Sequence, residues 1–191
     1  LMGKELWFQY DDNETSDINE VKARSLELLT NWNGDMMTNS PEPLIYSSWV
    51  KTFKKMLLED ELSLNHYLSN TISPLFLEKV LRNYKNAGTW CDIKHSNKIE
   101  TCAELSKKSL TTSLRKLRKE YGPDVDKWRW GNERRINHPP FSDDDILVPK
   151  FLREISSEVS GSPYTLNSIM LNYTSQNNEA KASSFKMIVD F

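Results

Sequence analysis

The chain has 191 residues, of which 38% are hydrophobic and 27% are charged, and 25 Lys and Arg against 27 Asp and Glu leave a formal charge of −2. This length suits one compact domain or a segment of a larger one. The near-neutral charge gives no global reason to expect a nucleic acid or an anionic membrane as partner, and no apolar run approaches the roughly 20 residues that a membrane helix needs.

Two helices are predicted in the first third of the chain. Apolar residues at helical spacing predict the first over residues 21–32, and Asn33-Gly34 ends it because glycine adopts the left-handed conformation at little cost. The sequence Ser40-Pro41-Glu42-Pro43 is typical of a helix start, with serine as the cap and proline in the first turn. The second helix is therefore predicted over residues 43–59.

Two further helices are predicted before residue 122. One begins near Pro74 and covers residues 74–84. The other covers residues 101–121, because Thr101-Cys102-Ala103-Glu104 matches the capping box, in which Thr is followed by Glu three residues later. Gly122-Pro123 ends this helix in the usual way.

The pattern changes after Pro139. Alternating segments rich in Tyr, Thr, Ile, Val and Phe predict strands near residues 164–172 and 185–191, with a polar loop at 174–183 between them. The predicted fold class is therefore α+β, with a mostly helical region at 1–138 and a strand-containing region at 139–191. The last apolar run reaches Phe191, so we expect the natural polypeptide to continue and the two regions to be parts of one incomplete domain.

No familiar catalytic or metal motif is present. His66, His95 and His138 lie far apart in sequence and none has a metal-ligand spacing. The two cysteines, Cys91 and Cys102, lack the Cys-x-x-Cys spacing; they permit one disulfide and fit two buried free thiols at least as well. Glycine-rich phosphate loops and the Gly-x-Ser-x-Gly nucleophile motif are absent. We therefore assign no catalytic, metal-binding or cofactor-binding residue and expect no cofactor.

The helix predicted at 101–121 is strongly basic and precedes Trp128-Arg129-Trp130, a combination that could bind phosphates. Four leucines at helical spacing give the same helix a core-facing side, which favours packing with a solvated basic outer face. We therefore expect no nucleic-acid partner and interpret the two tryptophans as packing residues. The six basic residues are Lys107, Lys108, Arg115, Lys116, Arg118 and Lys119, and the leucines are Leu105, Leu110, Leu114 and Leu117.

An ordered series of short motifs runs through most of the chain. In chain order, the motifs are Trp32-Asn33-Gly34, Asp60-Glu61-Leu62, Trp128 to Gly131, His138 with Phe141-Ser142, Thr165 with Asn167, and Ser184 to Asp190. This series resembles the C-terminal part of the large subunit of the penicillin acylase family, whose members are amide hydrolases of the N-terminal-nucleophile class.

Four residues depart from the family pattern. Asn33 stands where the family usually has Asp, and Arg134 stands where a His often follows Trp-Gly. Phe185 and Lys186 replace Tyr and Arg in the last motif. These departures fit a diverged or a decaying copy of the family.

The resemblance implies a mechanism in which a precursor cleaves itself and exposes a new N-terminal residue, usually Ser. Its hydroxyl attacks the amide carbonyl and its own α-amine acts as base. In the family these groups lie upstream of the matched segment, and this chain begins Leu1-Met2. We therefore expect a C-terminal fragment of a hydrolase of linear amide bonds that is non-catalytic by itself.

The alternative is a stand-alone helical interaction module that retains the scaffold without the chemistry. The expected partners of a fragment are the small subunit and the N-terminal part of the large subunit. Family members act on penicillins, cephalosporins and acyl-homoserine lactones, which implies a role in antibiotic metabolism. The resemblance also implies a periplasmic or secreted protein, although the start of the chain does not read as a signal peptide.

Overall fold

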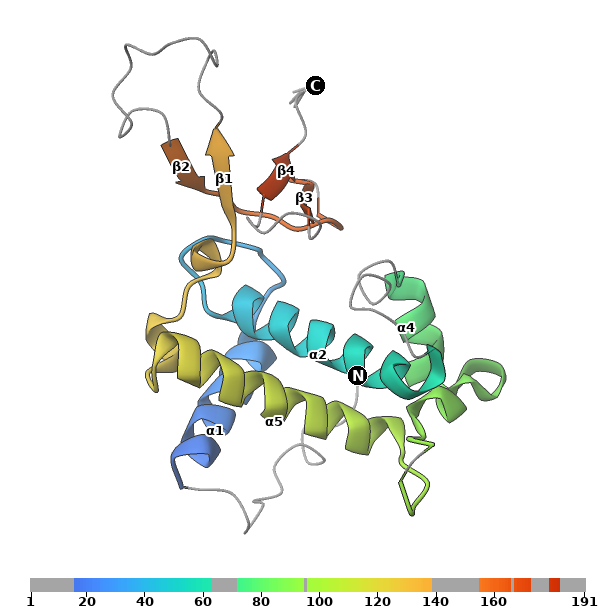
Figure 1. The fold of residues 1–191 in the computed structure, drawn as a ribbon. Helices are drawn as coiled ribbons and strands as arrows, with labels where there is room; N and C mark the ends of the chain where they lie inside the picture. The colour runs from blue at the N-terminus through green and yellow to red at the C-terminus, as the bar shows by residue number, and fades with distance from the viewer. Residues whose placement is uncertain are drawn as a thin grey trace. The chain divides into compact units, whose positions relative to one another are not determined.

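The computed structural model is mainly helical, with short strands near its C-terminal end (Figure 1). Its contacts divide the chain into two compact units. The first comprises Leu1–Asn31 and Ile45–Lys127, and the second comprises Trp32–Leu44 and Trp128–Phe191. The structure describes residues 16–62, 72–94, 96–138, 155–165, 167–172 and 179–182.

All four predicted helices are confirmed, with small differences at their ends. Helix α1 begins before its predicted start, where Asp17 supplies the acidic residue that favours a first turn. Helix α2 begins in the second unit and continues in the first. The helices are α1 Ser16–Asn31, α2 Glu42–Leu62, α4 Pro74–Leu81 and α5 Cys102–Tyr121. A 3₁₀ segment, η2 Tyr84–Cys91, lies between α4 and α5, and another, η3 Val125–Lys127, follows α5.

Helix α4 ends earlier than the predicted residue 84. The three residues Asn83, Lys85 and Asn86 have positive φ values of 50°, 53° and 67°, which no right-handed helix accommodates. Asparagine tolerates this conformation better than most residues, so two of the three sites suit it. The Asn83 side chain also accepts a hydrogen bond from the Gly88 N–H at 2.9 Å, which fixes the turn that follows α4.

Helix α5 has the capping residues that its sequence predicts. The Thr101 hydroxyl accepts a hydrogen bond from the Glu104 N–H, and the Glu104 carboxylate accepts one from the Thr101 N–H at 2.8 Å. At the other end Gly122 has φ +90° and donates its N–H to Arg118. The leucines of the predicted stripe are buried: Leu105, Leu110, Leu114 and Leu117.

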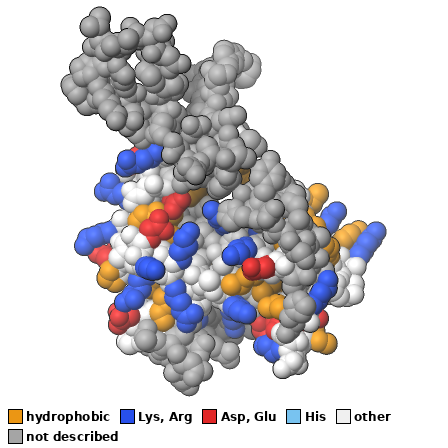
Figure 2. Space-filling view, viewed as in Figure 1, with side chains coloured by type: hydrophobic (Ala, Val, Ile, Leu, Met, Phe, Trp, Pro, Cys, Tyr) orange, Lys and Arg blue, Asp and Glu red, His pale blue; other side chains and the backbone are white. Residues whose placement is uncertain are grey.

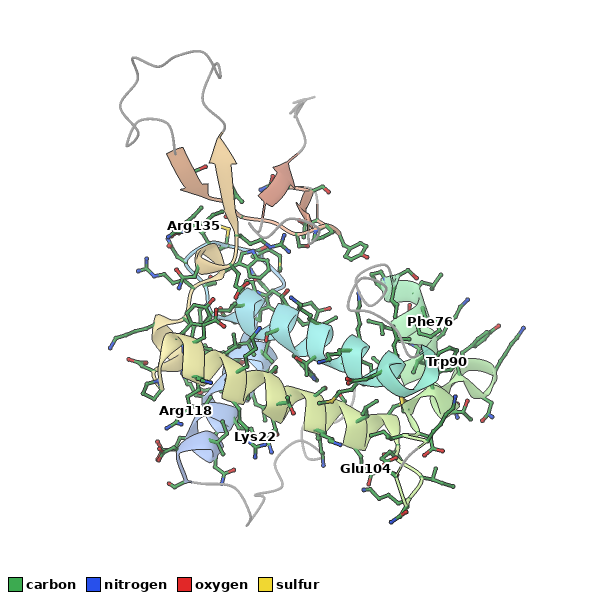
Figure 3. All side chains as sticks on the ribbon, in the orientation of Figure 1. Lys22, Phe76, Trp90, Glu104, Arg118 and Arg135 are labelled. Atoms are coloured by element: carbon green, nitrogen blue, oxygen red, sulfur yellow. A yellow bond between two sulfur atoms is a disulfide. The ribbon has the colours of Figure 1, made fainter. Side chains whose placement is uncertain are left out.

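The core of the first unit joins α2, α4, η2 and α5. Cys91 is fully buried there and forms a disulfide with Cys102, which decides between the two alternatives that the sequence leaves open. The rings of Phe76 and Trp90 meet edge to face beside it, with centroids 5.4 Å apart (Figure 3). The buried members of this core are Phe53, Leu57, Leu77, Val80, Cys91 and Leu105.

The second unit contains two antiparallel strand pairs. Strand β1 pairs with β2 so that Arg135 faces Glu158, and β3 pairs with β4 so that Ile169 faces Ala182. The strands are β1 Arg135–His138, β2 Ile155–Glu158, β3 Ile169–Asn172 and β4 Glu179–Ala182, and a short 3₁₀ segment, η4 Trp130–Asn132, precedes β1.

The strand predictions are only partly right. The strand predicted at 164–172 is confirmed over its last four residues, Ile169–Asn172. The prediction of a loop throughout 174–183 is wrong, since β4 occupies Glu179–Ala182 within it. Strand β1 begins ahead of the predicted change of character at residue 139. The strand predicted at 185–191 lies outside the described residues.

The disulfide should contribute measurably to the stability of the first unit. Cys91 and Cys102 are separated by 11 positions in sequence. Cross-linking a loop of that length removes unfolded-state entropy worth about 3 kcal/mol. We expect the double variant C91A/C102A to lose about that much free energy of unfolding in a urea titration. Reduced wild-type protein is the control and should unfold near the variant; a variant as stable as the oxidised protein would contradict the assignment.

Glu104 should make stability depend on pH in the acidic range. Hydrogen bonds from the Thr101 N–H and hydroxyl, followed by Lys98, lower the pKa of Glu104 to about 2. A lowered folded-state pKa stabilises the fold above the ordinary value of 4.5, and this contribution is lost as the pH falls towards 2. We expect E104Q to melt at a lower temperature than wild type at pH 6, and the difference to shrink near pH 2.

The control for this measurement is E59Q, which removes an exposed carboxylate from α2. Its melting temperature should differ from wild type by a similar small amount at both pH values. A melting difference for E104Q that stayed constant from pH 6 to pH 2 would show that the capping carboxylate is not the source of the effect.

Candidate functional site

Segments of the second unit that are far apart in sequence are joined by main-chain hydrogen bonds. The Trp130 N–H donates to the carbonyl of Ser40 at 3.0 Å, and the Gly131 N–H donates to that of Thr38 at 2.9 Å. The first turn after Trp128 is therefore fixed on the loop that precedes α2. We call the joined segments the tryptophan clasp: residues 36–40, 130–134 and 159–161.

The third segment of the clasp bonds to both of the others. The Gly161 N–H donates to the carbonyl of Met36 at 2.8 Å, and the Gly161 carbonyl accepts the indole N–H of Trp130 at 3.1 Å. The Val159 N–H donates to the carbonyl of Arg134 at 3.0 Å. Because the indole N–H is a buried donor, its bond to Gly161 removes the penalty of leaving it unsatisfied.

Trp130 of the clasp and Trp128, two residues before it, are both buried. Trp128 is 0% exposed and Trp130 is 2% exposed, so the prediction that they are packing residues is confirmed. The Arg134 guanidinium lies 4.6 Å from the centroid of the Trp130 ring and is itself 3% exposed. A guanidinium in this position is attracted by the ring face. Arg134 thus packs on the tryptophan instead of facing solvent.

The motif of Thr165 and Asn167 holds the turn that follows Gly161. The Thr165 hydroxyl accepts the Ser162 N–H at 2.8 Å and bonds to the carbonyl of Asn167 at 3.0 Å. The Asn167 amide donates to the carbonyl of Ser160. Both side chains therefore satisfy main-chain groups of their own turn, which is a structural role.

The Trp32-Asn33-Gly34 motif also folds back on neighbouring main chain. The Trp32 indole donates to the carbonyl of Asp35 at 2.9 Å. The Asn33 amide donates to the Asp35 carboxylate at 2.6 Å, and its oxygen accepts the Asp35 N–H at 3.0 Å. An aspartate at position 33 would place a second carboxylate against Asp35, so asparagine suits this particular loop.

None of the histidines contributes a described side chain to a site. His66 and His95 lie outside the described residues, and His138 is described only through its backbone, in β1. Within the part of the chain that the structure describes, no group of three or more His, Cys, Asp or Glu could hold a metal ion. No helix among those residues is long and apolar enough to cross a membrane.

Lys54 is a buried ionisable residue that no sequence motif singles out. Lys54 is 9% exposed, and its ammonium donates to the carbonyl of Ile72 at 2.9 Å. Burial lowers the pKa of Lys54 because the charged form loses hydration. The helical spacing could have predicted its burial, because position 54 adjoins Phe53 and Leu57 on the buried side of α2.

An open hollow of about 430 Å³ lies in the first unit between α1 and the end of α5. Two ion pairs form among the residues that line it. Arg118 pairs with Asp17 at 2.7 Å, and Arg24 pairs with Asp126 at 2.7 Å. The Asp126 carboxylate, followed by that of Glu27, accepts hydrogen bonds from Arg24 and raises the pKa of Arg24. These ion pairs join α1 to α5 and η3, so the lining has a structural role of its own.

The family model described as penicillin amidase matches residues 2–191. Neither the curated proteins nor the solved structures contain a match to the chain.

Gly161 should be much less replaceable than another glycine of similar backbone conformation. A Cβ at Gly161 would press against the backbone carbonyl of Asn167, and its φ is +108°. Gly122 has φ +90° with nothing within 4 Å of such a Cβ. We expect G161A to lose about 3 kcal/mol of unfolding free energy and the control G122A only about 1 kcal/mol, by urea titration. Equal losses would mean that backbone strain, and not crowding at Asn167, decides both.

Proposed function

The chain belongs to the penicillin amidase family, and from this premise we propose that it is the C-terminal, structure-forming part of the large subunit of an enzyme that hydrolyses linear amide bonds. The observation that carries the proposal is the tryptophan clasp. Residues separated by more than a hundred positions, such as Met36 and Gly161, are joined there by a main-chain hydrogen bond, and Trp130 and Gly131 of the Trp128–Gly131 motif bond to the loop before α2. The clasp thereby gives this motif a structural role and supports the position that we propose for the chain within the subunit.

The reaction that we propose for the complete enzyme needs a nucleophile with a free α-amine. The hydroxyl of the N-terminal residue attacks the amide carbonyl, its own amine takes the proton, and the leaving amine departs from the acyl group. Water then hydrolyses the ester. We propose that this chain performs none of these steps, and that its residues hold the strands and helices on which the nucleophile-bearing part of the enzyme packs.

The same proposal names partners and a compartment. The partners are the small subunit and the N-terminal part of the large subunit, which would complete one domain with both units described here. The Cys91–Cys102 disulfide supports an oxidising compartment, such as the periplasm or the medium, because cytosolic thiols are kept reduced. Amides of the penicillin, cephalosporin or acyl-homoserine lactone type are the substrates that we propose, which would place the enzyme in antibiotic metabolism.

The first test is an assay of the purified 191-residue chain with a penicillin, a cephalosporin and an acyl-homoserine lactone. We expect no turnover above the rate without protein. Turnover that a single substitution in this chain abolishes would overturn the proposal, because it would place a catalytic residue here. A chain that lacks turnover does not separate an enzyme fragment from a stand-alone module, so a second test uses the longer gene product.

That second test expresses the chain together with the coding sequence upstream of it. We expect self-cleavage, a Ser, Thr or Cys at the new N-terminus by sequencing, and amide hydrolysis. An unprocessed, inactive product that folds with the helical content of the isolated chain would favour the alternative, a stand-alone interaction module.

In the active longer product, the variant Trp130→Ala distinguishes a structural role of this residue from a catalytic one. Emptying this buried site should cost about 3–5 kcal/mol of stability. We expect less soluble enzyme but an unchanged turnover number for each active site, counted by titration with a covalent inhibitor. Trp130→Phe keeps most of the side-chain volume but loses the hydrogen bond to Gly161. Its stability should therefore lie between those of the wild type and Trp130→Ala. A reduced turnover number per titrated site would give Trp130 a role in positioning the reacting groups.

A further inference from the structure

Helix α5 presents a row of basic side chains on the side opposite Leu110, Leu114 and Leu117. Lys and Arg side chains are numerous on the surface that α5 turns to the viewer (Figure 2). At 100° per residue, three of the row lie within one narrow sector of the helix and the fourth lies beside it. We call this row the basic face, and its exposed members are Lys108, Arg115, Lys116 and Lys119.

Acidic residues near the two ends of α5 are already bonded to other groups, and Glu120 in its last turn accepts the Tyr121 hydroxyl at 3.3 Å. Asp17 accepts from Arg118 at 2.7 Å, and Glu104 caps the helix and pairs with Lys98 at 3.3 Å. Asp124, beyond the end of the helix, pairs with Lys127 at 2.9 Å. The interactions of the described residues consequently leave three lysines of the basic face without an ion pair: Lys108, Lys116 and Lys119.

This concentration of positive charge is local. The whole chain has a formal charge of −2, so the lysines of α5 do not simply reflect a basic protein. Lysines are costly to hold close together on one helix face, since like charges at neighbouring turns repel. A partner of opposite charge would relieve that repulsion as well as form new ion pairs.

The chemistry of the face favours carboxylates over phosphates or a membrane. The three unpaired cations are lysines, whereas bidentate phosphate recognition favours arginine. A polyanion would meet the negative net charge of the chain at long range, whereas a short acidic segment meets only the local face. None of the exposed large apolar side chains among the described residues lies on α5, so the face has no group to insert into lipid.

We propose that the basic face of α5 docks an acidic helix of a partner protein. Lys108 and Lys119 lie 11 residues apart, so the face spans about 16 Å along the axis, or three helical turns. A partner helix with Asp or Glu at successive turns on one side would match it. Exposed ion pairs are individually weak, so such docking would be reversible and sensitive to salt.

The test measures fluorescence anisotropy of a labelled peptide added to the 191-residue chain. The probe is a 16-residue Ala-rich helix, a length chosen to cover about three turns, with Glu at i, i+4, i+7 and i+11. Its matched controls replace the Glu by Gln, or scatter the same Glu around the helix. We expect saturable binding of the probe, about tenfold weaker binding of the scattered peptide, and loss of binding by the Gln peptide.

Charge reversal then locates the surface. K108E/K119E should weaken binding of the probe at least about tenfold. The control K55E/K79E reverses two exposed lysines on α2 and α4, which likewise have no ion pair with the described residues, and should leave binding unchanged. Circular dichroism would verify that both variants remain folded. Equal weakening in the two variants would overturn the proposal, since attraction would then depend on net charge alone.

Three other outcomes would also overturn it. A probe that does not bind at low salt removes the docking surface altogether. Tighter binding of polyphosphate or duplex DNA than of the probe would identify a phosphate-binding surface instead. Self-association of the chain that K108E/K119E abolishes, measured by sedimentation, would make a second copy the occupant.

Discussion

The hydrogen bond from the indole of Trp130 to the carbonyl of Gly161 is the interaction on which the second unit most depends. It lets a large ring be fully buried without leaving its polar N–H unsatisfied, at a donor–acceptor distance of 3.1 Å. The acceptor, Gly161, can lie so close only because it has no side chain and adopts a φ of +108°. Its own N–H then bonds to Met36, so one glycine links the tryptophan to the loop before α2. The second unit thus needs a large aromatic residue at position 130 together with a glycine at position 161.

The first unit is held in a different way, through leucines and a disulfide. Its helices meet through apolar side chains, and Trp49 adds a polar link by donating its indole N–H to Ser106 and Ser109 of α5, at 3.1 Å each. Ion pairs at the surface, such as Arg24 with Asp126, lie at exposed positions and contribute little each. Burial and the cross-link therefore account for more of this unit's stability than its charges do.

The parts of the fold that the sequence predicts are those decided by local interactions. The Thr101–Glu104 capping box and the Gly122 end involve neighbours in the chain, and the structure confirms both. Strands β1 and β2 form by pairing with each other although they are separated in sequence. Nothing in the sequence of Arg135–His138 by itself requires a strand. Strand β4, with the sequence Glu-Ala-Lys-Ala, even has low intrinsic preference for a strand. Its conformation comes from pairing with β3.

The candidate site follows the same division. The burial of Trp128 and Trp130 could be predicted, because the two residues lie in sequence between a predicted helix end and a predicted strand region, where large apolar rings are expected to pack. The partners of Trp130 could not, because Ser40 and Gly161 are set by the three-dimensional fold and carry no pattern of their own. The departure at Asn33 could be explained only with Asp35 in view, since the two side chains bond at 2.6 Å.

Trp130 and Gly161 also constrain which substitutions this part of the chain tolerates. Replacing Trp130 by a smaller residue empties a site, and replacing Gly161 by a larger one forces Asn167 away, so neither change is repaired by the other. Arg134 is different, because a stacked guanidinium needs only the ring face beside it. Position 134 therefore depends only on the ring face, whereas positions 130 and 161 depend on each other through the hydrogen bond.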